Sequence, residues 1–486
     1  PSGNRAPDST DQNSGYDQTR ADFDFDRGSN ASATRIGSDG LIKKYRENLL
    51  TYSNDFSNAA WNKNAGGSFT SGQSGYDGTN NAWQFNVTTA SNSGAWQNIT
   101  FSGVATFSAY FKKGTIDKIG FTNYAGSSYE CWFDLTNGTI GQQTGDLIDA
   151  KIEAVGTDGW YRCSITDVGS GNNYFQLKPS NAYSGTSTAG HIFIQSAQVE
   201  SSLVASSYLD STSVTGKAGV LVDLPRINYD ANGQNGSLLL EPSRVNLVTH
   251  SEYLNGITSA GGTITDNATI SPEGLQNAGV YIENTTNTYH RFNTGAQSYA
   301  QNQAHTFSVF AKSYSGNRFL IVNCSSAFGA RTYFDLSDGT KNVVSGTADI
   351  QDYGNGWYRC SVTGTRAAAT GFDSVYFGLN STEADSAYTG DGVSGMYFWG
   401  AQLEAGSYVS SYIPTMGTSE TRAADSCSVT GVSDVIGQTE GTLYWEVDFG
   451  VNDSAEYPAL FLYDGTSNNR VLIQRRGNNQ LLQYQI

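Results

Sequence analysis

The hexapeptide "GWYRCS" occurs twice in this chain, at residues 159–164 and again at residues 356–361. An identical match separated by about 200 residues indicates either an active-site motif used twice or a core strand of a duplicated domain. In the first copy, Tyr161 and Cys163 alternate with Trp160 and Arg162. This period of two predicts a β-strand with two distinct faces.

Four further pairs of similar segments accompany the hexapeptide in the same order and at nearly the same offset. They are "RENLLTYSNDF" (46–56) with "RVNLVTHSEYL" (244–254), "FSAYFKKG" (107–114) with "FSVFAKSYSG" (307–316), "CWFDLTNGT" (131–139) with "TYFDLSDGT" (332–340), and "AQVESSLVASSY" (197–208) with "AQLEAGSYVSSY" (401–412). The ordered set indicates a tandem duplication. We therefore predict five regions: an extended N-terminal segment (1–45), module 1 (46–212), a linker (213–243), module 2 (244–415), and the start of a third domain (416–486).

The matched segments are short apolar–polar alternations separated by turn sequences such as "TNG" and "SDG". This pattern is typical of antiparallel strands, and no long stretch has a helical period. We predict an all-β protein of tandem antiparallel β-sandwiches of the jelly-roll type. The hexapeptide is then a copied core strand. We expect Cys163 and Cys360 to be buried thiols, and each arginine of the hexapeptide to stack on the tryptophan two residues before it.

The composition disfavours several classes of function. The 486 residues carry a net charge of −17, which disfavours nucleic acid and anionic membranes as partners. No apolar run approaches the length of a membrane span, so we predict no membrane insertion. The five cysteines are widely spaced and contain no CxxC, which argues against a disulfide scaffold or a zinc site and fits synthesis in a reducing cytoplasm.

No catalytic motif is present. The four histidines do not form HExxH or another metal-ligand spacing, and we expect His305 at a surface or edge. "ADFDFDRG" (21–28) is similar to the start of a calcium loop but lacks the required glycine and glutamate, so a strand is the better interpretation. The acids that match between the copies, Glu200 with Glu404 and Asp134 with Asp335, lie inside shared strand motifs. We predict no enzyme, no cofactor and no metal.

Sugar recognition by aromatic faces is the better-supported possibility. Trp132 and Tyr333 occupy matching positions, on the strand face opposite the apolar residues of "WFDL" and "YFDL". Tyr110 and Phe310 match in the same way. These four residues are our glycan-binding candidates, as a second aromatic face of each jelly roll. The alternative is that a loop or a neighbouring subunit covers this second face.

The ordered motifs also resemble a known group of proteins. "ATRIGSDGLI" (33–42) followed by "RENLLTYSNDFSNAAW" (46–61), and "FWGAQLEAG" (398–406) followed by "SSYIPT" (410–415), are similar to segments of phage tail-fibre and related virion proteins. Those proteins carry carbohydrate-binding-module-like β-sandwiches. "ETRAADSCSVTG" (420–431) before "EGTLYWEVDF" (440–449) resembles the entry to a concanavalin-like, laminin-G-like domain. About 50 residues from Gly437 to Ile486 are too few for that domain. Either this chain is a fragment of a longer polypeptide, which we expect, or other chains complete the domain.

The resemblance implies a phage virion protein, a tail fibre or similar appendage, that attaches to host-surface polysaccharide. It further implies a homotrimer, an N-terminal segment that joins other virion proteins, and no catalytic residues. Two alternatives stay open. The modules are purely architectural spacers or capsid decoration, or they are the non-catalytic part of a polysaccharide depolymerase.

Overall fold

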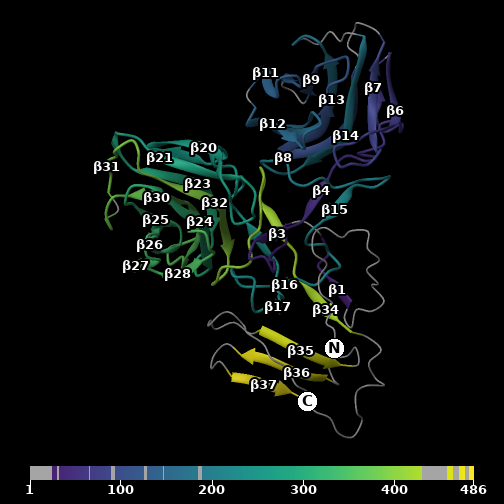
Figure 1. Cartoon of the computed structure of the whole chain (residues 1–486). Coiled ribbons are helices and arrows are strands. Elements are labelled where there is room, and N and C mark those ends of the chain that lie inside the picture. Colours follow the sequence, from purple (N-terminus) through teal and green to yellow (C-terminus); the bar gives the residue numbers. More distant parts are fainter. Residues whose placement is uncertain are drawn as a thin grey trace.

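A computed structural model describes residues 24–29, 32–64, 66–88, 94–124, 128–145, 147–183, 189–384, 386–429, 457–463, 470–476 and 481–485. Strands dominate these ranges (Figure 1), and the helical elements described among them are the 3-10 turn η2 (Leu254–Gly256) and the helix α1 (Ser325–Phe328). The prediction of an all-β chain of tandem β-sandwiches is confirmed. None of the described helices is long and apolar enough to cross a bilayer.

Module 1 is built around two long strands, β8 (Ala95–Lys112) and β13 (Trp160–Ser180), which pair along their full length and belong to both layers. The ten strands of module 1 form one continuous hydrogen-bonded sheet. The pairings divide it into one layer with the order β6-β7-β14-β8-β13-β12 and another with the order β5-β8-β13-β9-β10-β11, and the long strands β8 and β13 are shared by both. The remaining strands are β5 (Asn62–Lys63), β6 (Gly67–Gln73), β7 (Ala82–Val87), β9 (Lys118–Tyr124), β10 (Ser128–Asp134), β11 (Thr139–Thr144), β12 (Asp149–Val155) and β14 (Gly190–Glu200).

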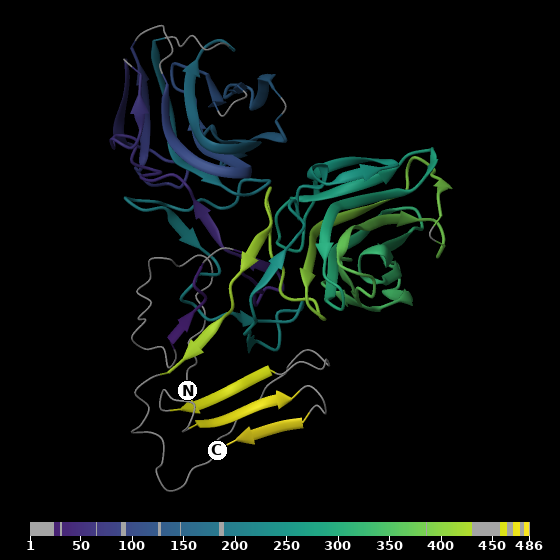
Figure 2. The same ribbon diagram turned by 180° about the vertical axis from the view of Figure 1, so that it is seen from behind.

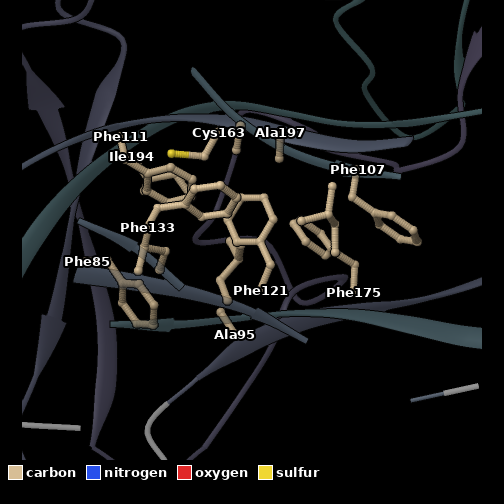
Figure 3. Packing of buried hydrophobic residues seen from close by; sticks show 14 of the residues in the cluster. Phe85, Ala95, Phe107, Phe111, Phe121, Phe133, Cys163, Phe175, Ile194 and Ala197 are labelled. Atoms are coloured by element: carbon tan, nitrogen blue, oxygen red, sulfur yellow. The ribbon is translucent and has the colours of Figure 1, made fainter. Parts of the chain in front are cut away.

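The core of module 1 lies between these two layers. Figure 3 shows its phenylalanines, which come from both layers and meet in the middle. The Phe121 ring lies 4.8 Å from Phe175 and 5.1 Å from Phe133, each time edge to face. Cys163 is fully buried in the same cluster, as predicted. Burial of these rings supplies most of the driving force for folding the module.

Module 2 repeats the same arrangement. Its two six-stranded sheets have the orders β20-β21-β32-β24-β29-β28 and β19-β23-β30-β25-β26-β27. The strands of these two sheets are β19 (Thr258–Ala260), β20 (Gly262–Thr269), β21 (Ala278–Glu283), β23 (His290–Tyr299), β24 (Ala304–Ser315), β25 (Phe319–Cys324), β26 (Ala330–Asp335), β27 (Thr340–Ser345), β28 (Thr347–Asp352), β29 (Tyr358–Thr365), β30 (Gly371–Asn380) and β32 (Gly395–Ala405). The short strands β22 (Asn287–Thr288) and β31 (Tyr388–Thr389) pair with each other in a separate two-stranded sheet. Cys360 is buried in its core.

The hexapeptide occupies equivalent places in the two modules. It begins β13 in module 1 and covers the start of β29 in module 2, where each strand pairs with the "FSAYF" or "FSVFA" strand. One prediction about it is wrong. Arg162 lies over the ring of Tyr110 at 5.4 Å and Arg359 over Phe310 at 5.2 Å, because the cross-strand neighbour is nearer than the tryptophan on the same strand.

A buried asparagine explains the motif "RENL" and its counterpart "RVNL". The Nδ2 of Asn48 donates to the carbonyls of Ala197 and Leu209, at 3.1 and 2.8 Å. Its Oδ1 accepts from the amides of Leu50 and Val199. Asn246 forms the same four hydrogen bonds in module 2, to the equivalent segments. The repeated motifs therefore preserve one hydrogen-bond network that ties the first strand to the last strand of each module.

The region predicted as a linker, residues 213–243, is instead part of a junction between the modules. It forms β15 (Gly216–Ala218), β16 (Ile227–Asn228) and β17 (Ser237–Leu238), and β15 pairs with β4 (Arg46–Asn48). Figures 1 and 2 show this junction between the two sandwiches. The other junction strands are β1 (Asp24–Asp26), β2 (Thr34–Ile36), β3 (Ile42–Lys44), β18 (Arg244–Asn246), β33 (Glu420–Arg422) and β34 (Ser426–Ser428).

Buried charges hold the junction together. Arg226 is fully buried and contacts the carboxylates of both Glu241 and Asp425. Arg422 is also fully buried and pairs with Glu241 at 3.2 Å, and Arg27 pairs with Asp425 at 3.1 Å. These pairs join the N-terminal segment, residues 213–243 and the segment after module 2. The described part of the N-terminal segment is thus packed against the rest of the chain.

The C-terminal region contributes a three-stranded antiparallel sheet of β35 (Tyr457–Tyr463), β36 (Arg470–Arg476) and β37 (Leu481–Gln485). Residues 430–456 lie outside the described part, as do residues 1–23. The concanavalin-like third domain and the role of the first residues as an anchor therefore stay predictions.

Candidate functional site

The structure buries all four aromatic candidates. Trp132 and Phe310 have no exposed surface, Tyr333 is 1% exposed and Tyr110 is 8% exposed. A sugar ring needs an exposed aromatic face, so these four residues do not form the glycan surface that we predicted. Other side chains cover two of the candidates: Tyr76 stacks on Tyr110, with ring centroids 3.7 Å apart, and Phe310 packs against Tyr353 and Trp399.

A pocket on module 1 instead brings together polar and aromatic side chains, most of which are partly or fully exposed, whereas Gln195, Ser196 and Ser211 are buried. Its volume is about 550 Å³, a size typical of small-molecule sites. Its lining comes from the loop after β4, the loop between β6 and β7, β14, and the tail that follows β14. The lining residues are Tyr52, Asn54, Asp55, Tyr76, Asp77, Asn81, Gln195, Ser196, Tyr208, Asp210, Ser211 and Thr212.

A β-bulge in β14 forms the floor of the pocket. The register of β14 against β8 shifts between Gln195 and Gln198, and Ser196 adopts a left-handed conformation with φ 57°. The Ser196 amide then donates to Oδ1 of Asn54 at 2.8 Å. A bulge changes the direction in which the neighbouring side chains point. Here the side chain of Gln195 lies beneath the loop between β6 and β7.

Gln195 positions that loop by two hydrogen bonds. Its Oε1 accepts from the Tyr76 amide at 3.1 Å, and its Nε2 donates to Oδ2 of Asp77 at 3.0 Å. Asn54 fixes the other end of the loop by donating to the Asn81 carbonyl at 3.2 Å. The side chains of the loop are thus placed before any ligand arrives, which lowers the entropy cost of binding.

Three ionisable groups of the pocket, Tyr76, Asp77 and Tyr208, have pKa values shifted by their surroundings. Burial raises the pKa of Tyr76 to about 12. Burial also raises the pKa of Tyr208, whose hydroxyl contacts Ser53 at 2.6 Å and Asp210 at 2.9 Å. Burial alone would raise the pKa of Asp77, but hydrogen bonds from Thr79 and Gln195 lower it overall. The phenols of Tyr76 and Tyr208 therefore stay neutral hydrogen-bonding groups, and Asp77 is a carboxylate.

The pocket carries only negative formal charge. Three of its lining residues are aspartates (Asp55, Asp77 and Asp210), and none is lysine, arginine or histidine. Like charges repel anionic ligands, so the pocket favours neutral or cationic ones.

Module 2 contains the counterpart of this pocket, but it is filled. The loops 74–81 and 270–277 have equal length and matching turns: Gly75 N donates to Thr79 O, and Ser271 N to Leu275 O. By register, Asn54, Asp77 and Gln195 correspond to Glu252, Glu273 and Trp399. The ring of Trp399 lies 5.3 Å from Phe310 and 4.6 Å from Tyr412 and packs in the same cluster as Ile42 of β3.

The side chain of Lys44 also occupies the pocket of module 2. Its Nζ lies 3.1 Å from Oε1 of Glu252 and 2.9 Å from Oε2 of Glu273, and Glu252 is fully buried. Asn277 donates to both carboxylates, at 3.1 Å each. The amide of Ile42 donates to the Pro272 carbonyl at 2.9 Å. The N-terminal strand β3 is thus held in module 2 where module 1 has an open pocket.

The remaining candidates have structural surroundings. Glu200 accepts from the amide and hydroxyl of Ser206, and Glu404 accepts in the same way from Ser410. His305 is 2% exposed and packs between Tyr299 and Phe328, so the expectation of a surface position is wrong. Within the described ranges, no three His, Cys, Asp or Glu residues are grouped as a metal site.

Sequence reasoning missed the pocket because it weighed residues that match between the copies. The residues that distinguish the pocket differ between the copies: Tyr76, Asp77 and Gln195 against Pro272, Glu273 and Trp399. The available signal was the difference between the copies, above all Trp399 in module 2 where module 1 has Gln195.

No protein-family model matches this chain, and no curated protein is similar to it at a significant level. Among solved structures, the chain is weakly similar to the N-terminal CBM22-1–CBM22-2 tandem domain from Paenibacillus barcinonensis Xyn10C, with 12% identity and a TM-score of 0.24 over 78% of this chain and 100% of that chain. It is also weakly similar to an oxalate decarboxylase, with 12% identity and a TM-score of 0.09 over 70% of this chain and 74% of that chain. Arguments about function therefore rest on the pocket itself.

Proposed function

We propose that module 1 binds carbohydrate in the pocket of Tyr76, Asp77 and Gln195. The observation that carries the proposal is an open cavity of about 550 Å³ with three tyrosines and a set of amide and carboxylate groups. Sugars have apolar ring faces and many hydroxyls, so they suit tyrosine rings beside fixed hydrogen-bonding groups. Each aromatic contact contributes roughly 0.5–1.5 kcal/mol beyond the area it buries.

We propose further that the whole chain is a structural and adhesive protein of a phage virion, a tail fibre or similar appendage, that displays this module toward host-surface polysaccharide. The tandem sandwiches and the sequence resemblance support this role. A homotrimer, attached to other virion proteins through the N-terminal segment, would present several weak sites at once. Multiple display raises apparent affinity by about 10²–10⁴ where the geometry allows simultaneous contact. In this proposal the chain has no catalytic role.

The test is binding of the purified chain to an array of bacterial capsular and O-antigen glycans. The variant Tyr76→Ala removes a ring from the pocket wall, and Tyr208→Phe removes one hydroxyl. Tyr314→Ala, in an exposed tyrosine of module 2, is the matched control. We expect glycan binding that falls at least fivefold in Tyr76→Ala and is unchanged in Tyr314→Ala, with equal circular dichroism spectra. Binding that no pocket variant alters would refute this site.

A second candidate function is architectural, and the filled pocket of module 2 favours it for that module. There the N-terminal segment is held by the buried pair of Lys44 and Glu252. Module 2 in this view sets the orientation of module 1 rather than binding a ligand. Truncation of residues 1–44 should then change the relative orientation of the modules in small-angle scattering, without changing glycan binding by module 1.

A further inference from the structure

The filled pocket of module 2 indicates what chemical group the open pocket of module 1 accepts. The two pockets share a backbone frame and the same β-bulge with a left-handed residue (Ser196 at φ 57°, Gly400 at φ 64°). They also share a tyrosine, Tyr208 or Tyr412, whose hydroxyl contacts an equivalent serine at 2.6 Å. In module 2 the occupant is a primary ammonium, Nζ of Lys44, bound by Glu252 and Glu273. The chain itself therefore supplies one example of a group that this frame binds.

The equivalent position in module 1 lies between Asn54 and Asp77. Asn54 keeps an amide oxygen where module 2 has the carboxylate of Glu252, and Asp77 keeps the carboxylate of Glu273 in a side chain one methylene shorter. Asp55 and Asp210 add two further carboxylates to the lining, and no cationic side chain opposes them. Module 1 thus has an acceptor-rich pocket without the ammonium that balances its counterpart.

We propose that the pocket of module 1 selects saccharides that carry a free amino group over their N-acetylated and their acidic equivalents. This rests on the proposed function, because it names the ligand class of the same site. The ammonium would lie beside Asp77, and the tyrosines would contact the sugar rings. An uronic acid or phosphorylated glycan would instead bring a negative charge to three carboxylates, which disfavours binding.

The selectivity has a predictable size. An ion pair that stays partly in water contributes up to about 1 kcal/mol, which corresponds to a factor of about five in the dissociation constant. Further carboxylates near the ammonium add to this binding free energy, and salt screens the whole electrostatic contribution. We expect at least fivefold tighter binding of the amine at low ionic strength, with a difference that shrinks as sodium chloride is added.

The experiment compares matched pairs of oligosaccharides by isothermal titration calorimetry with the full chain. The probes are glucosamine and galactosamine oligomers as free amines, the same oligomers fully N-acetylated, and oligogalacturonate. Asp77→Asn should weaken amine binding two- to fivefold and leave the acetylated oligomers unchanged. Asn54→Glu, which restores the acid of module 2, should strengthen amine binding. Lys341→Gln, on an exposed part of module 2, is the charge-changing control.

The outcomes separate this inference from the proposed function. Equal or tighter binding of the acetylated or acidic oligomers, at the same pocket, overturns the amine preference and leaves carbohydrate binding intact. If no saccharide binds but the peptide GLIKKYR, residues 40–46, does, the pocket is a docking site for a strand of another copy, and both proposals fall. If neither the saccharides nor the peptide binds, the amine preference and the proposed function are both overturned.

Discussion

The ion pair of Lys44 offers the sharpest test of how the junction is held. The change is Lys44→Met, which keeps most of the aliphatic stem and removes the ammonium. Lys44 is 7% exposed and Glu252 is fully buried, so the variant leaves a buried carboxylate without its counter-ion. Removal of one partner from a buried pair generally costs about 3–5 kcal/mol.

The lower end of that range applies here. Glu252 keeps hydrogen bonds from Asn277 Nδ2 and from the Tyr412 hydroxyl, at 3.1 Å each. We therefore expect about 3 kcal/mol, which corresponds to a roughly 100-fold rise in the equilibrium constant for release of β3 from module 2.

The loss should also depend on pH, with a defined sign. Burial raises the pKa of Glu252 above its ordinary value, and Glu273 raises it further, whereas Lys44 lowers it. Without Lys44 the pKa of Glu252 must rise. An acid whose pKa is higher in the folded state costs no stability below its unfolded pKa of about 4.3, and stability falls as the pH rises from there through the folded pKa. Lys44→Met should thus cost less at pH 5 than at pH 8.

Hydrogen exchange measured by mass spectrometry is the assay, with peptides that cover β3 and the loop 270–277. Lys43→Met is the matched control, because its partner Asp39 is half exposed and the pair contributes at most about 1 kcal/mol. The double variant Lys44→Met/Glu252→Gln should recover much of the loss. The reasoning is refuted if Lys44→Met and Lys43→Met accelerate exchange of β3 equally, or if the effect is the same at pH 5 and pH 8.

Three further predictions test the fold. Asn246→Ala removes four buried hydrogen bonds and should lower the stability of module 2 by about 4 kcal/mol in thermal unfolding; a loss under 1 kcal/mol would contradict the proposed network. Burial raises the pKa of the Cys360 and Cys427 thiols, but Cys427 is less buried, so iodoacetamide should modify it first and Cys360 only on unfolding, as peptide mapping can measure. Gly103→Ala should loosen the contact of module 1 with the segment after module 2, because Gly103 has φ 91° and an added Cβ would lie 1.7 Å from the Met416 carbonyl oxygen. The Val104 amide donates to that oxygen at 2.7 Å, so unchanged hydrogen exchange of this amide would refute the prediction.

The duplicated sandwich was predictable because both copies need the same residues at the same positions of the fold. Asn48 and Asn246 make the same buried hydrogen bonds, and Cys163 and Cys360 fill equivalent core positions. Strand alternation is a local signal, so each core strand could be predicted without knowledge of its partners. The junction was not predictable in this way. Its strands are two or three residues long, too short to show a period, and its stability comes from buried arginines such as Arg226.

The pocket could not be predicted for a different reason. Trp132 and Tyr333 match between the copies because they are buried, so the rule that selected them as glycan ligands selected packing residues instead. A binding surface depends on residues that need not match, from loops that only the bulge of β14 brings together. Gln195, at that bulge, has no local sequence pattern that predicts its hydrogen bonds to Tyr76 and Asp77.

The comparison of the two modules suggests how one fold supports two roles. In module 2 the pocket has an apolar wall formed by Trp399 and two negative charges from Glu252 and Glu273. Ile42 of β3 packs in the same cluster as that wall, and Lys44 of β3 pairs with both carboxylates. A pocket that holds a strand this tightly cannot also hold a ligand. In module 1, Gln195 replaces the tryptophan and the same position stays open. Because the two modules share the frame, the division between a junction and the proposed binding site requires only a few side-chain changes and no change of fold.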